Sequence, residues 1–220
     1  IFSYRSVGLN MGQTVEQQVL ARVYGHGRGW AFSPKDFLHL GSRKAIDVAL
    51  IRLTNAATIR RVVRGIYDYP RFSDFLNQHL GPDIHQVSLA YARKFGWSIQ
   101  PGSAAALNLI GLSTQVPSQY VYYSNGPDRK YMIDKTALQF EKTPLKETRF
   151  RMEETGIVVQ AIKALGQKGI TSDVRRTIRE WLGPNKLSKV LKDAERITDW
   201  VYAEIKEICT EGMSTGDTNG

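Results

Sequence analysis

The chain has 220 residues, which is long enough for one large domain or two modest ones, each with its own hydrophobic core. Lysine and arginine number 30 against 21 acidic residues, and the resulting net charge of +9 is typical of proteins that bind nucleic acid. Cys209 is the only cysteine, which excludes an internal disulfide and a cysteine-based zinc site. No apolar run reaches the roughly 20 residues of a membrane span, and the first ten residues lack a signal-peptide core. We therefore expect a cytoplasmic protein that does not bind membranes.

The first part of the chain predicts two helices separated by a short strand. Valines at every fourth position indicate an amphipathic helix over residues 14–24, and residues 30–32 read as a short strand. Ser33 then caps a second helix, with Pro34 in its first position. Lys35 in this helix is expected to remain available for a DNA phosphate.

The next segment predicts a recognition helix over residues 43–55, with Ser42 as its N-cap. Its buried stripe consists of Ala45, Ile46, Ala49, Leu50 and Leu53. Together with Ser42, the candidate DNA contacts are Arg43 at the margin of the opposite face, Lys44, Asp47, Val48 and Ile51. Arginine and lysine suit guanine acceptors, aspartate can accept from cytosine, and apolar side chains meet thymine methyl groups. The alternative is a solvated helix face whose two apolar residues are covered by another domain.

A hairpin with a basic tip is predicted directly after this helix. Residues 58–62 form its first strand, Gly65 can take the positive φ of a tight turn, and residues 66–69 return until Pro70 ends the pairing. Such a wing would place guanidinium groups near flanking phosphates or in the minor groove. The guanidinium groups belong to Arg60, Arg61 and Arg64. Basic hairpin tips also occur as solubility devices, but the order of helix, turn, helix and wing favours DNA binding.

Beyond Pro70 the sequence predicts a connector over residues 72–82 and a helix that ends at Gly96. The further predicted elements are a helix over 103–112, a strand over 120–123 that turns at Asn125 and Gly126 into a returning strand over 130–133, a third strand over 137–142, and helices over 156–165, 172–182, 186–194 and 198–209. We expect an α+β fold with a winged helix-turn-helix over residues 14–72. A mixed α/β C-terminal domain with a small sheet and several helices follows over 83–209, and a flexible tail over 210–220.

The residue types that carry catalysis are present but scattered. His26, His39, His79 and His85 form no pair at metal-ligand spacing. Glu153 and Glu154 are adjacent and would point in different directions on a helix, and Cys209 lies on an apolar helical stripe. We therefore expect no catalytic residue, no metal site and no cofactor.

A second cluster of cations lies in the predicted C-terminal helices. Eight basic residues occur between Lys163 and Lys192 against two acidic ones, Asp173 and Glu180. Such a run usually solvates helices, but it could also extend the DNA contact, touch RNA or meet an acidic partner. The candidate residues of this second basic surface are Arg175, Arg176, Arg179, Lys186 and Lys189.

Several short motifs resemble the AbiEi-type antitoxins of bacterial type IV toxin–antitoxin systems. Those of the C-terminal half are Gln100-Pro101-Gly102-Ser103, Gly111-Leu112-Ser113-Thr114-Gln115-Val116-Pro117, Val121-Tyr122 and Asn125-Gly126. Those of the N-terminal half are Trp30-Ala31-Phe32-Ser33-Pro34, Arg43-Lys44-Ala45-Ile46-Asp47 and Gly65-Ile66-Tyr67-Asp68-Tyr69-Pro70. Together they span most of residues 14–165, and the helices from about residue 171 onward lie outside the resemblance.

The resemblance implies an N-terminal winged helix-turn-helix that represses its own operon and a C-terminal domain needed to neutralise a nucleotidyltransferase-like toxin. The expected partners are therefore double-stranded DNA of the chain's own promoter, with inverted repeats, and the cognate toxin. Two alternatives remain open at this stage. One is a ligand-responsive winged-helix regulator whose second domain has an apolar pocket with convergent polar groups. The other is an enzyme that acts on the toxin or on nucleic acid.

Overall fold

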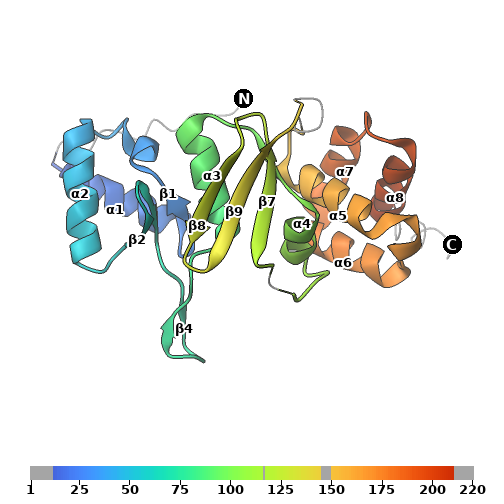
Figure 1. Ribbon diagram of the computed structural model, residues 1–220, viewed down its shortest axis with the longest axis horizontal. Coiled ribbons are helices and arrows are strands. Elements are labelled where there is room, and N and C mark those ends of the chain that lie inside the picture. The colour runs from blue at the N-terminus through green and yellow to red at the C-terminus, as the bar shows by residue number, and fades with distance from the viewer. Residues whose placement is uncertain (1–11, 116, 145–149, 211–220) are drawn as a thin grey trace, which may run out of the picture. The chain divides into compact units, whose positions relative to one another are not determined.

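The computed structural model describes residues 12–115, 117–144 and 150–210. The chain divides between Lys94 and Phe95 into two compact units. Both units contain helices and strands, so the fold is mixed α+β (Figure 1). Of the flexible tail predicted over residues 210–220, Thr210 is the last residue of a helix, and residues 211–220 lie outside the described residues.

Unit 1 begins with the elements that the sequence predicts. They are α1 (Val15–His26), β1 (Ala31–Phe32), the 3-10 helix η1 (Pro34–Phe37), α2 (Arg43–Asn55), β2 (Arg60–Val63) and β3 (Ile66–Asp68). The short helix after Ser33 is thus a single 3-10 turn rather than an α-helix. The three strands form an antiparallel sheet in the order β1-β3-β2.

Local sequence explains where the two α-helices begin. Thr14 and Gln17 form a reciprocal capping box at the start of α1. The Ser42 hydroxyl accepts a hydrogen bond from the Ala45 N–H at 3.3 Å, which fixes the first turn of α2. The apolar faces of both helices pack on β1 and η1, and the buried core of unit 1 consists of Val19, Val23, Trp30, Phe32, Phe37, Ile46, Ala49, Leu50, Leu53 and Ile59.

The predicted connector contains a second hairpin, β4 (Phe72–Ser73) and β5 (Gln78–His79). Each strand has only two residues, too few to give a period-2 signal. The next helix, α3 (Ile84–Phe95), is joined to unit 1 by Arg93. Its guanidinium contacts the Asp36 carboxylate at 2.8 Å and donates to the Ala31 carbonyl at 2.6 Å. Residues 84–94 therefore fold with unit 1, whereas the sequence placed residue 83 onward in the second domain.

Unit 2 contains a four-stranded sheet, and the sequence did not predict the order of its strands. Its strands are β6 (Ile99–Pro101), β7 (Gln119–Ser124), β8 (Arg129–Ile133) and β9 (Thr136–Lys142), in the order β6-β7-β9-β8. The predicted pairing of β7 with β8 is wrong, because β9 lies between them and runs parallel to β7. Leu138 and Phe140 of β9 are fully buried, whereas Lys130 of β8 is exposed. The apolar strand occupies the interior position, and the charged strand forms the edge.

Five helices complete the described part of unit 2. They are α4 (Ser103–Ile110), α5 (Glu153–Gly169), α6 (Ser172–Leu182), α7 (Pro184–Asp193) and α8 (Asp199–Thr210). Their apolar faces form one core that includes Ile162, Ile178 and Val201. Cys209 is buried in this core, which confirms its predicted structural role.

Candidate nucleic-acid interface

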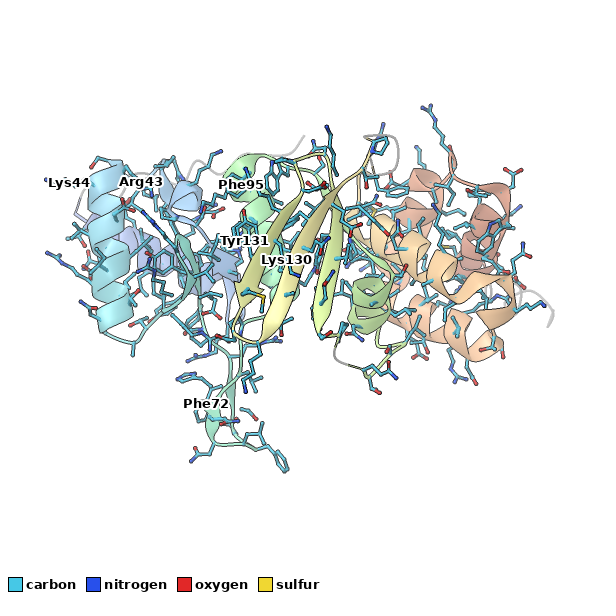
Figure 2. All side chains as sticks on the ribbon, in the orientation of Figure 1. Arg43, Lys44, Phe72, Phe95, Lys130 and Tyr131 are labelled. Carbon is cyan, nitrogen blue, oxygen red and sulfur yellow. The ribbon has the colours of Figure 1, made fainter. Side chains whose placement is uncertain are left out.

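Helix α2 presents the outward face that the sequence predicts. Ile46, Leu50 and Leu53 are buried, whereas Val48 is 40% exposed and Ile51 is 56% exposed. Lys44 and Arg43 are also exposed, and they lie at the same end of the helix (Figure 2). The face therefore combines cations with uncovered apolar groups.

Two of the predicted base contacts bind one another. The Arg43 Nε lies 2.9 Å from Oδ1 and 3.0 Å from Oδ2 of Asp47, one turn further along α2. Their side chains are 61% and 44% exposed, so the pair lies on the surface. Either group would have to leave its partner, or the pair would have to act as a unit, to contact a base edge.

A hollow of about 380 Å³ borders the α2 face on the side of α1. Lys44 and Val48 of α2 and Glu16 of α1 are among its lining residues. Arg52, which the sequence analysis did not single out, also lines it and contacts Glu16 at 3.3 Å. Glu16 therefore holds one of the cations on this side of the helix.

The β2–β3 hairpin has the predicted turn, with Gly65 at φ +77°. Arg61 and Arg64 are exposed, as a wing that grips DNA requires. Arg60 is different, because it lies at the base of the hairpin, directly across from Asp68. The prediction that all three arginines lie near the tip is therefore wrong for Arg60.

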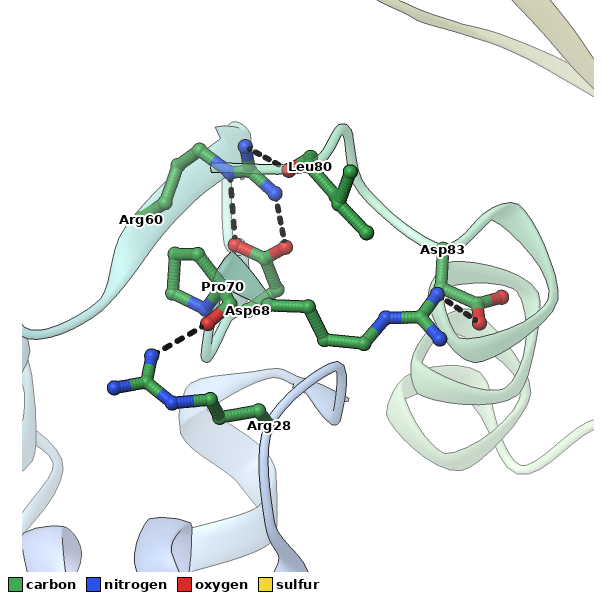
Figure 3. Close-up of polar contacts among 7 residues, drawn as sticks. Arg28, Arg60, Asp68, Pro70, Leu80 and Asp83 are labelled. Atoms are coloured by element: carbon green, nitrogen blue, oxygen red, sulfur yellow. Dashed lines mark hydrogen bonds and ion pairs between the residues drawn. The ribbon is translucent and has the colours of Figure 1, made fainter. Parts of the chain in front are cut away.

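Arg60 has a structural role (Figure 3). Its Nε and one terminal nitrogen contact the two carboxylate oxygens of Asp68 at 3.0 and 2.5 Å, and its other terminal nitrogen donates to the Leu80 carbonyl at 3.0 Å. Asp68 is almost completely buried, so its charge depends on this partner. We therefore remove Arg60 from the set of candidate DNA contacts.

Two further arginines hold the ends of this region together (Figure 3). Arg28 donates to the Pro70 carbonyl at 2.8 Å, and Arg71 contacts Asp83 at 3.0 Å. These contacts join the chain before β1, the end of β3 and the start of α3. Part of the basic surplus of unit 1 therefore stabilises the fold.

Lys94 is a cation of this surface that the sequence analysis missed. Its Nζ lies 3.0 Å from the position that a Cβ on Gly65 would occupy, so it lies beside the wing turn. Burial and the nearby Arg43 lower the pKa of Lys94 from its ordinary value. Lys35, a predicted phosphate contact, donates from Nζ to the Lys94 carbonyl at 3.2 Å. Arg43, Lys35 and Lys94 thus gather from three elements, a proximity that only the fold of α3 onto η1 creates.

Three of the five residues of the predicted second basic surface pair with carboxylates, and a fourth bonds a backbone carbonyl. Arg175 contacts Glu204 at 2.8 Å and Glu207 at 3.0 Å, and Arg179 donates to the Ile208 carbonyl at 2.5 Å. The remaining contacts are those of Arg176 with Asp173 at 2.7 Å and of Lys186 with Glu154 at 2.7 Å. Of the five predicted residues, Lys189 lies elsewhere, in a cleft of unit 2. Arg175 and Arg179 are therefore held by partly buried contacts, whereas Arg176 and Lys186 form more exposed ion pairs, and a role for this second basic surface stays a prediction.

His26 packs on an aromatic ring, and Cys209 lies in the core of unit 2. The His26 ring stacks on Trp30 with centroids 3.8 Å apart, and burial, with help from Arg22 and Arg93, lowers the pKa of His26. Burial raises the pKa of the Cys209 thiol. Among the described residues, no group of three or more potential metal ligands is close enough to hold an ion. In the same part of the chain, every helix is too short or too polar to cross a membrane.

The comparison with known families identifies the chain. A family model described as a family of unknown function (DUF6088) matches residues 18–190. Because the match covers well over half of the 220 residues, the chain belongs to this family. A search of curated proteins gives no match.

Proposed function

We propose that this member of the DUF6088 family is a sequence-specific DNA-binding protein whose unit 1 acts as a winged helix-turn-helix. The observation that carries the proposal is the outward face of α2, where Lys44 lies next to the exposed apolar residues Val48 and Ile51. In the proposed complex α2 enters the major groove. Its cations donate to guanine, and its apolar side chains contact thymine methyl groups.

The wing supports this proposal through charge. Arg61 and Arg64 are exposed on a hairpin that follows α2 directly, and Lys94 lies beside its turn. In the complex these three cations bind phosphates next to the site that α2 reads. Phosphate contacts fix the register of the protein on the duplex, and base contacts specify the sequence.

We further propose that the protein represses its own promoter and acts as the antitoxin of a type IV toxin–antitoxin system. This part depends on the resemblance of its motifs to AbiEi-type antitoxins, with unit 2 counteracting a nucleotidyltransferase-like toxin. Inverted repeats about one helical turn apart in the promoter would bind two copies. The proposal includes no enzymatic step.

DNA binding can be tested by fluorescence anisotropy with a labelled duplex from the chain's own promoter. We expect tight binding that survives an excess of unrelated duplex and weakens as salt rises. The variants Lys44→Gln and Ile51→Ala should reduce the preference for the promoter. Equal affinity for promoter and unrelated duplex would contradict a sequence-specific function.

The antitoxin role needs a separate test in cells. The neighbouring reading frame is expressed with and without this chain, and growth is measured. We expect the neighbour to arrest growth and the full chain to restore it, whereas Lys44→Gln should lose repression and keep the rescue. A neighbour that is harmless alone, or arrest that the full chain fails to relieve, would contradict the antitoxin role without affecting DNA binding.

A further inference from the structure

Unit 2 contains a cleft of about 970 Å³ between the segment that precedes α5 and the end of α7. This volume is at the upper end of the roughly 300 to 1,000 Å³ of small-molecule sites. Four cations line it, together with three apolar residues and two carboxylates. The cations are Arg151, Lys189, Lys192 and Arg196.

The walls of the cleft are held by Asp193. Its Oδ1 accepts from the Arg151 N–H and its Oδ2 from the Met152 N–H, both at 3.0 Å. The Asp193 carboxylate therefore joins the end of α7 to the chain before α5, and both of its oxygens accept hydrogen bonds from backbone N–H groups. A ligand in the cleft would have to be held by side chains, because these backbone donors are occupied.

The four cations differ from those of α6. Arg175 and Arg176 of α6 contact carboxylates of unit 2, as described above. No ion pair joins Arg151, Lys189, Lys192 or Arg196 to a carboxylate within the described residues, and all four are exposed. Lys189 and Lys192 are three residues apart in α7, so they lie on the same side of that helix, and Arg196 joins them from the turn that follows α7. Cations that converge on a hollow favour a ligand with several negative charges.

The apolar residues give the ligand a second requirement. Phe150, Met152 and Ile197 line the cleft and pack against the core of unit 2. An aromatic ring beside flexible cations is the combination that binds a nucleobase by stacking and its phosphates by charge. An acidic peptide would bind the cations but would have no planar group to stack on Phe150.

We propose that this cleft is a nucleotide-binding site. The base lies against Phe150 and Ile197, and the phosphates contact Lys189, Lys192 and Arg196. The site belongs to unit 2 and is independent of the proposed DNA contacts of unit 1. Binding involves no covalent step.

The test is isothermal titration calorimetry of the full chain with ATP as the probe. Adenosine and inorganic triphosphate are titrated separately, to distinguish the base from the phosphates. The variant Lys189→Gln/Lys192→Gln removes two cations of the cleft. The matched control Lys163→Gln/Lys168→Gln removes two exposed lysines of α5 that do not line it.

We expect ATP to bind at least tenfold more tightly than adenosine or triphosphate. The cleft variant should lose at least tenfold in affinity, and the control should remain within about twofold of the wild type. Circular dichroism checks the fold of each variant, and Arg196→Gln replaces the double variant if that one fails to fold. The promoter titration is run on the same samples, so that a loss of nucleotide binding is distinguished from a loss of DNA binding.

Three results would overturn the nucleotide site. They are no binding of ATP, equal ATP affinity in the wild type and the cleft variants, and binding of triphosphate as tight as that of ATP. A glutamate hexapeptide that binds where ATP does not would assign the cleft to an acidic protein partner instead.

Discussion

Arg43 and Asp47 form a two-oxygen ion pair on the outward face of α2, one helical turn apart. Because both are exposed, the pair contributes little to stability, about 0.2 to 1 kcal/mol. In the proposed DNA complex its effect would be larger, because Asp47 would present a negative charge to the duplex while it holds the Arg43 guanidinium along the helix.

Replacement of the carboxylate in Asp47→Asn should therefore loosen the recognition of sequence. We expect the affinity for unrelated duplex to rise about two- to fivefold, the factor that corresponds to release of an exposed ion pair. The preference for the promoter should fall, because Asp47 no longer selects a base or positions Arg43. Anisotropy with both duplexes measures the ratio, and an unchanged ratio would contradict a role for the pair in recognition.

The arginines of the hairpin should separate into two classes. Arg60→Ala leaves the buried Asp68 carboxylate without its partner and should lower the free energy of unfolding by about 2 to 4 kcal/mol, less than for a fully buried pair because Arg60 is partly exposed. Arg61→Ala removes an exposed side chain and should change the free energy of unfolding by less than about 0.5 kcal/mol. The same variant should weaken DNA binding. Urea unfolding gives the comparison. Equal stability of the two variants would contradict the structural role of Arg60.

Helix α2 could be predicted to the residue because its signals are local. Ser42 provides the cap, and the apolar positions from Ile46 to Leu53 fall on one side of the helix. Exposure of Val48 and Ile51 follows from the same periodicity. The sequence therefore predicts which residues of α2 face outward at the candidate site.

Features that depend on distant residues could not be predicted in this way. The alternation of apolar and polar residues within a strand predicts the strand but not its neighbour in the sheet, so the parallel pairing of β7 with β9 could not be predicted. The cations of α6 appear as a charge run in the sequence, but Glu204 and Glu207 neutralise Arg175 from α8. Lys94 belongs to the site only because Arg93 docks α3 on Asp36.

The stability of unit 1 should depend on pH through His26. Because its pKa is lowered by folding, the unfolded chain binds the proton more readily. Stability from this group is complete above the ordinary histidine pKa of about 6.5 and is lost as the pH falls through the lowered value. Thermal melts of His26→Phe, which retains a ring against Trp30, should show a flatter acid limb than the wild type.

The control for this prediction is His39→Phe, which changes an exposed histidine of the same unit. Its acid limb should follow that of the wild type. If His26→Phe loses stability with acid as steeply as the wild type does, the stacked imidazole is not the group responsible.

The Asn125-Gly126 motif should be sensitive to size rather than to backbone freedom. A Cβ on Gly126 would lie 2.4 to 2.6 Å from ring atoms of Trp97. Gly126→Ala should therefore cost about 1 to 3 kcal/mol of stability through overpacking. The control Gly81→Ala places a Cβ where no atom lies within 4 Å and should be nearly neutral.

A double variant checks the cause. In Gly126→Ala/Trp97→Leu the indole is absent, so the cost of the pair should be smaller than the sum of the two single costs. Urea unfolding of the four proteins gives the coupling energy. Strict additivity would show that the contact with Trp97 is not what excludes a side chain at this position.

The salt dependence of promoter binding tests the central claim most directly. Each phosphate contact that a cation makes adds about 0.9 to the slope of log affinity against log salt concentration. The triple variant Arg61→Gln/Arg64→Gln/Lys94→Gln should lower the slope by about three, and the matched triple Lys163→Gln/Lys168→Gln/Lys206→Gln should leave it unchanged. If the first triple variant keeps the wild-type slope and affinity, the wing and Lys94 do not bind DNA phosphates, and the winged-helix account of binding is contradicted.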